Sequence, residues 1–127
     1  MAFWIFMMAS NFLIPVLMII FGRVFLKHPP KTINSIYGYR TTMSGKNQET
    51  WDFAHQYCGK LWWRLGWILF IISIFVMLPV IGKDEGTVGT WGSVFEMIQA
   101  AVLLLSIFPT EKALRKNFDK EGNRRKE

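Results

Sequence analysis

The sequence predicts a single-domain, all-α integral membrane protein with three transmembrane helices and a folded cytoplasmic loop. Half of its residues are hydrophobic (51%), and they lie in three long runs. Nearly all charged residues lie in the stretches between or after these runs, as expected when the apolar segments are dissolved in lipid. These stretches also differ in positive charge, which predicts how the chain is oriented across the membrane.

The three expected spans cover about residues 2–22, 62–82 and 90–109. The runs have no charged side chain or a single one in their apolar cores, and about 20 apolar residues in a helix cross roughly 30 Å of hydrocarbon. A cleaved signal peptide is disfavoured for the first run, because the charges of Arg23 and Lys27 follow the apolar residues and do not precede them.

Positive charge predicts an amino terminus outside the cell and a carboxyl terminus inside. Seven Lys/Arg lie between Arg23 and Arg64 and seven follow Pro109, whereas only Lys83 lies between the second and third runs. The loop at about 23–61 and the tail at about 110–127 are therefore expected in the cytoplasm. Tryptophans mark the expected interfaces: Trp4 and Trp91 outside, Trp62 and Trp63 inside.

The expected loop is rich in aromatic and apolar residues, so it should fold against the inner membrane face and not behave as a solvated linker. His28-Pro29-Pro30 should end the first helix. Cap-type residues around Ser44 to Asn47 predict that another helix starts there. That helix either lies along the interface or runs directly into the second span.

The loop also carries a multi-residue motif: Asn34, then Tyr37-Gly38-Tyr39-Arg40-Thr41, then Ser44, Glu49, Trp51, His55 and Gly59. This pattern, placed between two spans, resembles the core motif of the SdpI-type immunity protein family. The resemblance implies protection of a bacterium against a membrane-damaging peptide toxin, and in addition a signalling role through a cytoplasmic repressor. The motif residues expected to form a binding site in the inner loop are Asn34, Tyr37, Gly38, Arg40, Thr41, Glu49, Trp51 and His55.

Two motif residues have alternative interpretations. Arg40 presents a rigid fork of donors that suits a carboxylate or phosphate of a ligand or partner, but it could also pair with Glu49 or a lipid phosphate and pin the loop. Trp51 is interpreted first as an anchor at the membrane interface and second as a recognition residue.

Glu96 is an ionisable residue inside the third span, where charge is costly and usually faces a partner or a water-filled cavity. It shares a helical stripe with Gln99, and Asn11 and Ser10 of the first span are its expected partners. These residues form either a functional polar site, centred on Glu96, Gln99 and Asn11, or a packing contact between helices.

The residue types argue for binding and against catalysis. The chain has one cysteine and two histidines, without metal-ligand spacing, so no metal or other cofactor is expected. No nucleophile or phosphate-loop motif is present, and the basic residues flank apolar runs, which favours lipid headgroups over nucleic acid as partners. The resulting hypothesis is a multi-pass protein of the bacterial cell membrane that gives immunity to a peptide toxin. The alternative is a small transporter or channel that works as a homo-oligomer and uses Glu96.

Overall fold

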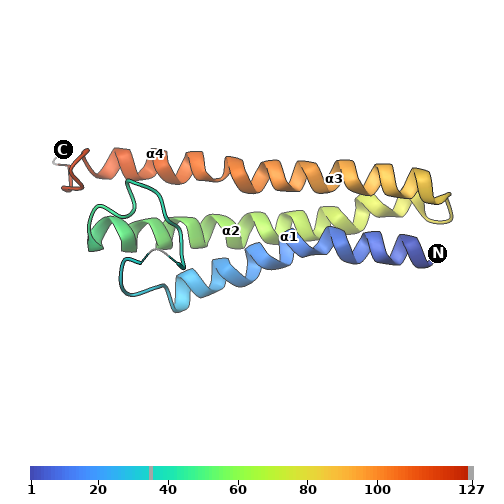
Figure 1. Ribbon diagram of the computed structural model, residues 1–127, viewed down its shortest axis with the longest axis horizontal. Coiled ribbons are helices and arrows are strands. Elements are labelled where there is room, and N and C mark those ends of the chain that lie inside the picture. Colours follow the sequence, from blue (N-terminus) through green and yellow to red (C-terminus); the bar gives the residue numbers. More distant parts are fainter. Residues whose placement is uncertain (35, 126–127) are drawn as a thin grey trace.

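The computed structural model describes residues 1–34 and 36–125, and this part of the chain folds into a helical bundle. Its elements are α1 (Ala2–Lys27), α2 (Gln48–Met77), the 3₁₀ helix η1 (Leu78–Val80), α3 (Glu85–Leu105) and α4 (Ile107–Asn117). Helices α3 and α4 are nearly collinear, so the bundle consists of three long rods (Figure 1). The N-terminus and the 81–84 turn lie at one end, which we call the turn end. The 28–47 segment and the C-terminus lie at the other, the loop end.

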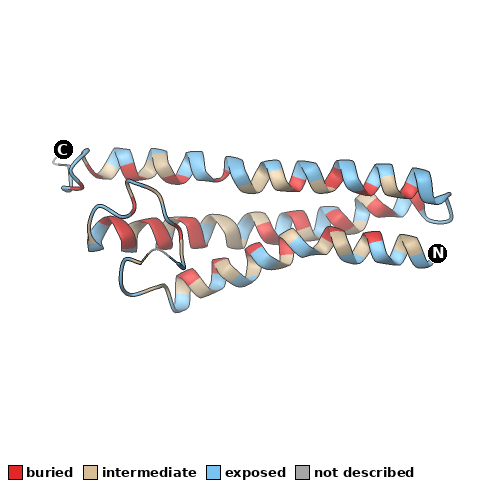
Figure 2. Ribbon diagram, in the orientation of Figure 1, coloured by how far each residue is buried: buried red, intermediate tan, exposed pale blue. Residues whose placement is uncertain are grey.

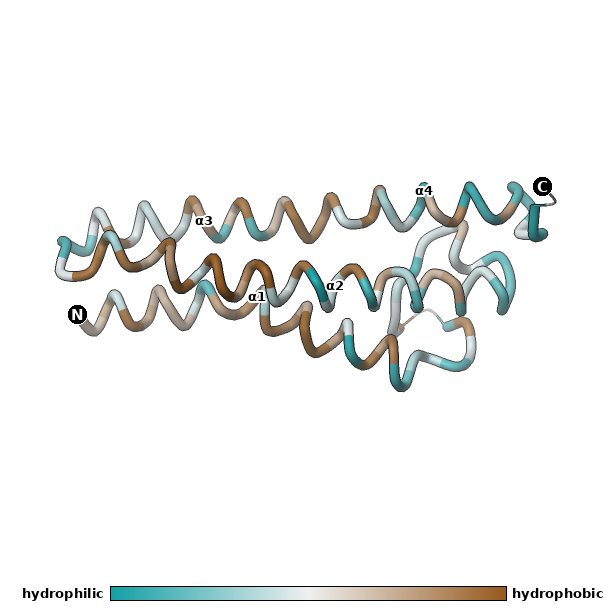
Figure 3. Tube along the Cα trace, turned by 180° about the vertical axis from the view of Figure 1, so that it is seen from behind, coloured by the Kyte–Doolittle hydropathy of each residue, from teal (hydrophilic) through white to brown (hydrophobic). Residues whose placement is uncertain are grey.

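All three rods are long and apolar enough to cross a membrane: Ala2–Lys27, Gln48–Val80 and Glu85–Asn117. Hydrophobic residues fill the middle of the bundle and hydrophilic residues gather at the loop end (Figure 3). The outward faces of the rods are exposed, and many of these exposed side chains are large and apolar, such as Phe6, Leu13, Ile68, Phe75, Met97 and Leu104 (Figure 2). An apolar exterior of this kind suits lipid as the solvent. The prediction of an all-helical fold with three candidate spans is confirmed, whereas the orientation across the membrane stays a prediction.

The helices extend beyond the expected spans. Helix α1 continues through Lys27, α2 begins at Gln48, and the third rod ends at Asn117. The connection between the first two rods is therefore 28–47, about half of the expected 23–61. Hydropathy marks only the apolar part of a helix, whereas backbone hydrogen bonding continues into polar surroundings until a cap or a proline ends it.

The predicted helix start is a capping box at Asn47. The Asn47 side chain accepts a hydrogen bond from the Thr50 N–H at 2.9 Å, and the Thr50 hydroxyl accepts one from the Asn47 N–H at 3.0 Å. Of the two alternatives for this helix, the structure shows that it runs directly into the second rod. At the other end of the connection, His28 ends α1 immediately before Pro29, as expected.

Glycines bring α1 and α2 into backbone contact. A Cβ added at Gly22 would lie 2.6 Å from the backbone nitrogen of Trp63, and one added at Gly66 would lie 2.9 Å from the backbone nitrogen of Ile19. Small residues permit this close approach, which is a common way for helices to associate in lipid. The contact fixes how α1 and α2 face each other along their length.

Candidate functional site at the loop end

Gly38 places the motif loop directly on α2. Its backbone has a φ of +114°, which side-chain-bearing residues rarely adopt. An added Cβ would lie 2.6 Å from Nε2 of His55 and 3.2 Å from the Trp51 ring. Both the conformation and the lack of space therefore require glycine between the two tyrosines of the motif.

His55 is completely buried and links this loop to the helix. Its Nε2 accepts a hydrogen bond from the Tyr39 backbone N–H at 2.8 Å, and its Nδ1 lies 2.8 Å from the carbonyl oxygen of Trp51. Because an N–H donor occupies Nε2, that nitrogen carries no proton, and Nδ1 must donate to the carbonyl. The neutral imidazole thus satisfies one backbone donor and one backbone acceptor.

Trp51 lies inside the protein. Its side chain is 1% exposed, its indole N–H donates to the Pro30 carbonyl oxygen at 2.8 Å, and its ring packs 4.5 Å from that of His55. The expectation that Trp51 is an anchor at the membrane interface is wrong, because protein and not lipid covers the ring. Trp51 and His55, which lie one turn apart on α2, form the surface on which the loop folds.

Tyr39 connects the loop to the third rod. Its hydroxyl donates to Oε1 of Glu111 in α4 at 2.8 Å. Burial raises the pKa of Tyr39, and the Glu111 carboxylate raises it further, so the phenol stays neutral and keeps its proton for this bond. The expected set of site residues omitted both Tyr39 and Glu111, although Tyr39 was part of the motif.

The remaining polar motif residues build turns. Oδ1 of Asn34 accepts hydrogen bonds from the backbone N–H groups of Ile36 and Tyr37, at 3.0 and 2.7 Å. Thr41 and buried Ser44 exchange reciprocal bonds between backbone N–H and side-chain hydroxyl, at 2.9 and 3.1 Å. These local bonds hold the loop in one shape.

A smaller group of motif residues faces outward. Tyr37 is 38% exposed, and Arg40 and Glu49 are also exposed, as is the neighbouring Ile36. The Glu49 carboxylate makes an ion pair with Arg124 at 3.5 Å, so it links the start of α2 to the C-terminal segment. An exposed pair of this length contributes little to stability. These outward residues are the part of the motif that a ligand or partner can reach.

A second polar cluster lies in the middle of the bundle, and it forms because Pro15 interrupts the backbone hydrogen bonds of α1. Proline has no N–H, so the Asn11 carbonyl loses its partner within α1. Gln99 of α3 donates to that carbonyl at 3.0 Å, and the Ser73 hydroxyl of α2 lies 3.3 Å from it. The Asn11 carbonyl of α1, which has no partner within its own helix, therefore bonds to side chains of the other two rods.

Glu96 lies one turn from Gln99 and accepts a hydrogen bond from the Ser10 hydroxyl. The structure thus brings together the expected polar residues Asn11, Gln99 and Glu96, with Ser10 as the partner of Glu96. Oδ1 of Asn11 and Oε1 of Gln99 are buried and have no hydrogen-bond partner among the described residues. These contacts join α1 and α3, and they fit both interpretations of the cluster, a functional polar site and a packing contact between helices.

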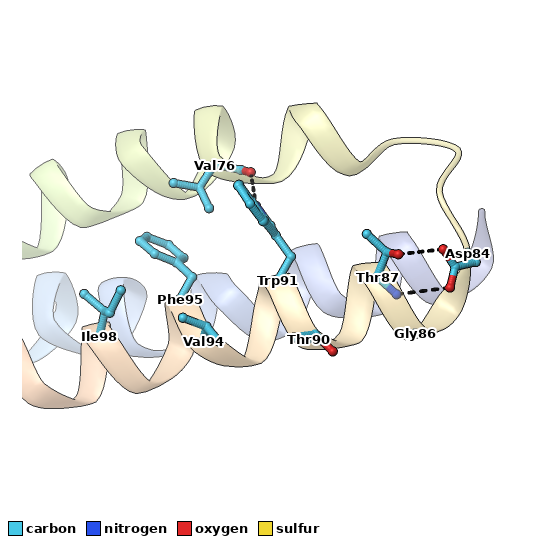
Figure 4. A pocket seen from close by; sticks show the side chains of 9 residues that line it. All are labelled: Val76, Asp84, Gly86, Thr87, Thr90, Trp91, Val94, Phe95 and Ile98. Atoms are coloured by element: carbon cyan, nitrogen blue, oxygen red, sulfur yellow. Dashed lines mark hydrogen bonds between the residues drawn. The ribbon is translucent and has the colours of Figure 1, made fainter.

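A groove with a volume of about 800 Å³ lies at the turn end, between α2 and α3 (Figure 4). Trp91 lies in its wall and donates its indole N–H to the Val76 carbonyl oxygen at 2.6 Å. Apart from Thr90, Thr87 and Asp84, which lie toward one end, its lining is largely apolar, including Val94, Phe95 and Ile98. This groove lacks convergent polar groups and suits lipid chains better than a specific ligand.

No group of three His, Cys, Asp or Glu side chains within 1–34 and 36–125 is arranged to hold a metal ion.

The fold and the motif loop define a class of protein: a multi-pass helical membrane protein with an ordered loop folded onto one end of its bundle. A family model described as "SdpI/YfhL protein family" matches residues 31–110, which is more than half of the chain and includes the whole motif. The chain belongs to the SdpI/YfhL protein family, as its motif predicted. Membership in this family suggests an immunity-type membrane protein.

One curated relative is similar to part of the chain. The chain is 49% identical over 45 residues to "Uncharacterized protein YfhL" of Bacillus subtilis (strain 168). The matched stretch covers 35% of this chain and 41% of the relative, so the similarity spans less than half of either protein. No solved structure matches the chain significantly.

Proposed function

We propose that the chain protects a bacterial cell membrane against a membrane-active peptide toxin, and that it acts by binding at the loop end. Its membership in the SdpI/YfhL family, with a match over residues 31–110 that includes the motif loop, is the observation that carries this proposal. The partner at the loop end is the toxin itself or a cytoplasmic protein, such as a repressor, that reports the toxin's presence.

The ordering of the 28–47 connection supports a binding role. Two antiparallel helices need only about 2–8 residues to connect them. This connection has 20 residues, and each of the 19 that the structure describes loses roughly 1–2 kcal/mol of backbone conformational entropy when it is fixed. Buried hydrogen bonds through Tyr39, Ser44, Trp51 and His55 hold this connection against the helices, and each contributes about 1 kcal/mol. A loop that only joined two helices would not require this network.

Arg40 is the outward motif residue with the most directional chemistry, because its guanidinium can form two parallel bonds to a carboxylate or phosphate. Arg40→Lys keeps the charge and loses the fork, so it should retain membrane insertion and lose much of the protection. Arg40→Ala should lose more. Lys31→Ala removes one exposed positive charge from the same connection and serves as the matched control.

The test measures membrane abundance and survival together in a toxin-sensitive bacterium that expresses each variant, across a set of membrane-active peptides. Selective loss of protection for the Arg40 variants, at normal abundance and with an active Lys31→Ala control, supports the proposal. Full protection by Arg40→Ala would remove Arg40 from the binding site. Parallel loss of abundance and protection would return Arg40 to a structural role.

The alternative function is a small oligomeric transporter or channel that uses Glu96. The observation in its favour is the polar cluster, where Glu96 lies one turn from Gln99, and where Oε1 of Gln99 and Oδ1 of Asn11 are buried without a hydrogen-bond partner among the described residues. Transport predicts that activity depends on Glu96 and on an ion gradient, whereas recognition predicts dependence on the loop end. Dissipating the proton and sodium gradients during a survival assay separates the two.

A further inference from the structure

A second pocket lies at the loop end, between residues 41–46, helix α4 and residues 118–125. Its volume is about 640 Å³, within the range of small-molecule sites. Four basic side chains and two acidic ones line it: Lys46, Arg115, Lys120, Arg125, Glu111 and Asp119. We call it the loop–tail pocket.

The two acids of the pocket are already used by the fold. Glu111 accepts the Tyr39 hydroxyl, and Oδ1 of Asp119 accepts backbone N–H groups of Glu121 and Asn123 at 3.0 and 2.9 Å. Neither forms an ion pair with a pocket cation within residues 1–34 and 36–125. The lining of the pocket therefore keeps an excess of positive charge that no ion pair among the described residues holds.

The basic side chains keep their donors available. The Arg125 side chain donates from Nε to the carbonyl oxygens of Arg115 and Phe118 at 2.7 and 3.1 Å, and these bonds, like the others it makes to described residues, leave its terminal amino groups unused. In the described part of the chain, the charged ends of Lys46, Arg115 and Lys120 make no hydrogen bond or ion pair. A concave site with several unneutralised donors suits an anion with multiple acceptor oxygens.

From this geometry we propose that the loop–tail pocket binds a phosphate group, carried by a small soluble molecule or by a lipid headgroup. Four cations against two acids leave a net charge of +2, which matches a phosphate or diphosphate. Thr41, Thr42 and Met43 of the 28–47 connection lie in the same lining, so occupancy would be linked to the shape of that connection. This proposal goes beyond the immunity function and does not rest on it.

The position of the loop–tail pocket along the third rod favours a small soluble molecule over a lipid headgroup as the carrier of the phosphate. The Trp62 indole, expected at headgroup level, donates to the Ser106 hydroxyl at 2.9 Å. Glu111 and Arg115 follow Ser106 by five and nine residues, which corresponds to about 8 and 14 Å of helix. Headgroup layers are only about 5–8 Å thick on each side, so the pocket opens at or beyond their outer edge.

The test uses the full chain in nanodiscs of zwitterionic phosphatidylcholine, with inorganic pyrophosphate as the soluble probe and calorimetry at low ionic strength. Lys46→Gln/Arg115→Gln removes two exposed cations from the pocket. Lys60→Gln/Arg64→Gln removes two exposed cations from α2 outside it and is the matched control. The pocket variant should bind pyrophosphate about tenfold more weakly or worse, while the control stays within about threefold of the unmodified chain.

A second arm distinguishes the source of the phosphate. Native mass spectrometry counts the phosphatidylglycerol molecules that each variant retains from anionic membranes. Selective loss of pyrophosphate binding supports a soluble ligand, and selective loss of retained lipid supports a headgroup. The proposal is overturned if the pocket and control variants weaken equally, or if the unmodified chain binds neither probe. Thermal unfolding of both variants checks that each is folded.

Discussion

Gly22→Ala tests whether backbone contact between α1 and α2 holds the bundle together. An alanine Cβ at this position would lie 2.6 Å from the backbone nitrogen of Trp63 and 2.9 Å from the carbonyl oxygen of Gly59. Backbone atoms cannot rotate away as a side chain does. The two helices must therefore separate locally by about 0.8 Å before the contact reaches the ordinary 3.4 Å.

The expected loss of stability follows from two opposing effects. Overpacking a close contact costs about 1–3 kcal/mol, and a rigid backbone partner places this site near the upper end. Alanine has the better helix propensity, which returns up to about 1 kcal/mol. The net expectation for Gly22→Ala is a decrease of about 2 kcal/mol in the free energy of unfolding.

The assay is reversible unfolding of the purified chain in detergent micelles, followed by tryptophan fluorescence. Gly89→Ala is the matched control, because its new Cβ would lie 3.4 Å from the Phe3 ring, at ordinary contact distance. The control should be neutral or slightly stabilised by helix propensity. If Gly22→Ala is as stable as the unmodified chain while the control behaves as expected, backbone contact does not stabilise the α1–α2 pair.

Three other perturbations test the orientation and two tertiary contacts. In intact cells, a membrane-impermeant thiol reagent should label the Thr87→Cys variant and not the Asn123→Cys variant. Cys58 is buried, so it should add little background labelling. The opposite labelling pattern would refute the predicted orientation. Glu96→Gln keeps an oxygen that accepts from its serine partner, so unfolding should change by less than about 1 kcal/mol. If this folded variant loses activity, the transport alternative gains support. Tyr39→Phe should lower the free energy of unfolding by about 1 kcal/mol, because the Glu111 carboxylate loses its hydrogen-bond donor. An unchanged temperature of thermal unfolding would show that the bond between Tyr39 and Glu111 does not stabilise the fold.

Local sequence patterns predicted the elements of this protein because their causes are local. A long uncharged run is sufficient to indicate a helix that can span lipid, and all three appear. The cap-type residues before Gln48 predicted the start of α2, since a capping box needs only neighbouring groups. The motif pointed to the family for the same reason: its residues lie within one short stretch.

The tertiary structure alone decided which helix faces meet. Pairs such as Tyr39 with Glu111 and Glu49 with Arg124 join residues about 70 positions apart, which no local pattern encodes. In water, apolar periodicity would reveal the buried face of each helix, but in lipid both the packed and the exposed faces are apolar. The sequence therefore could not show that Trp51 is covered by protein, or that the carbonyl freed by Pro15 is bonded by Gln99 from another helix.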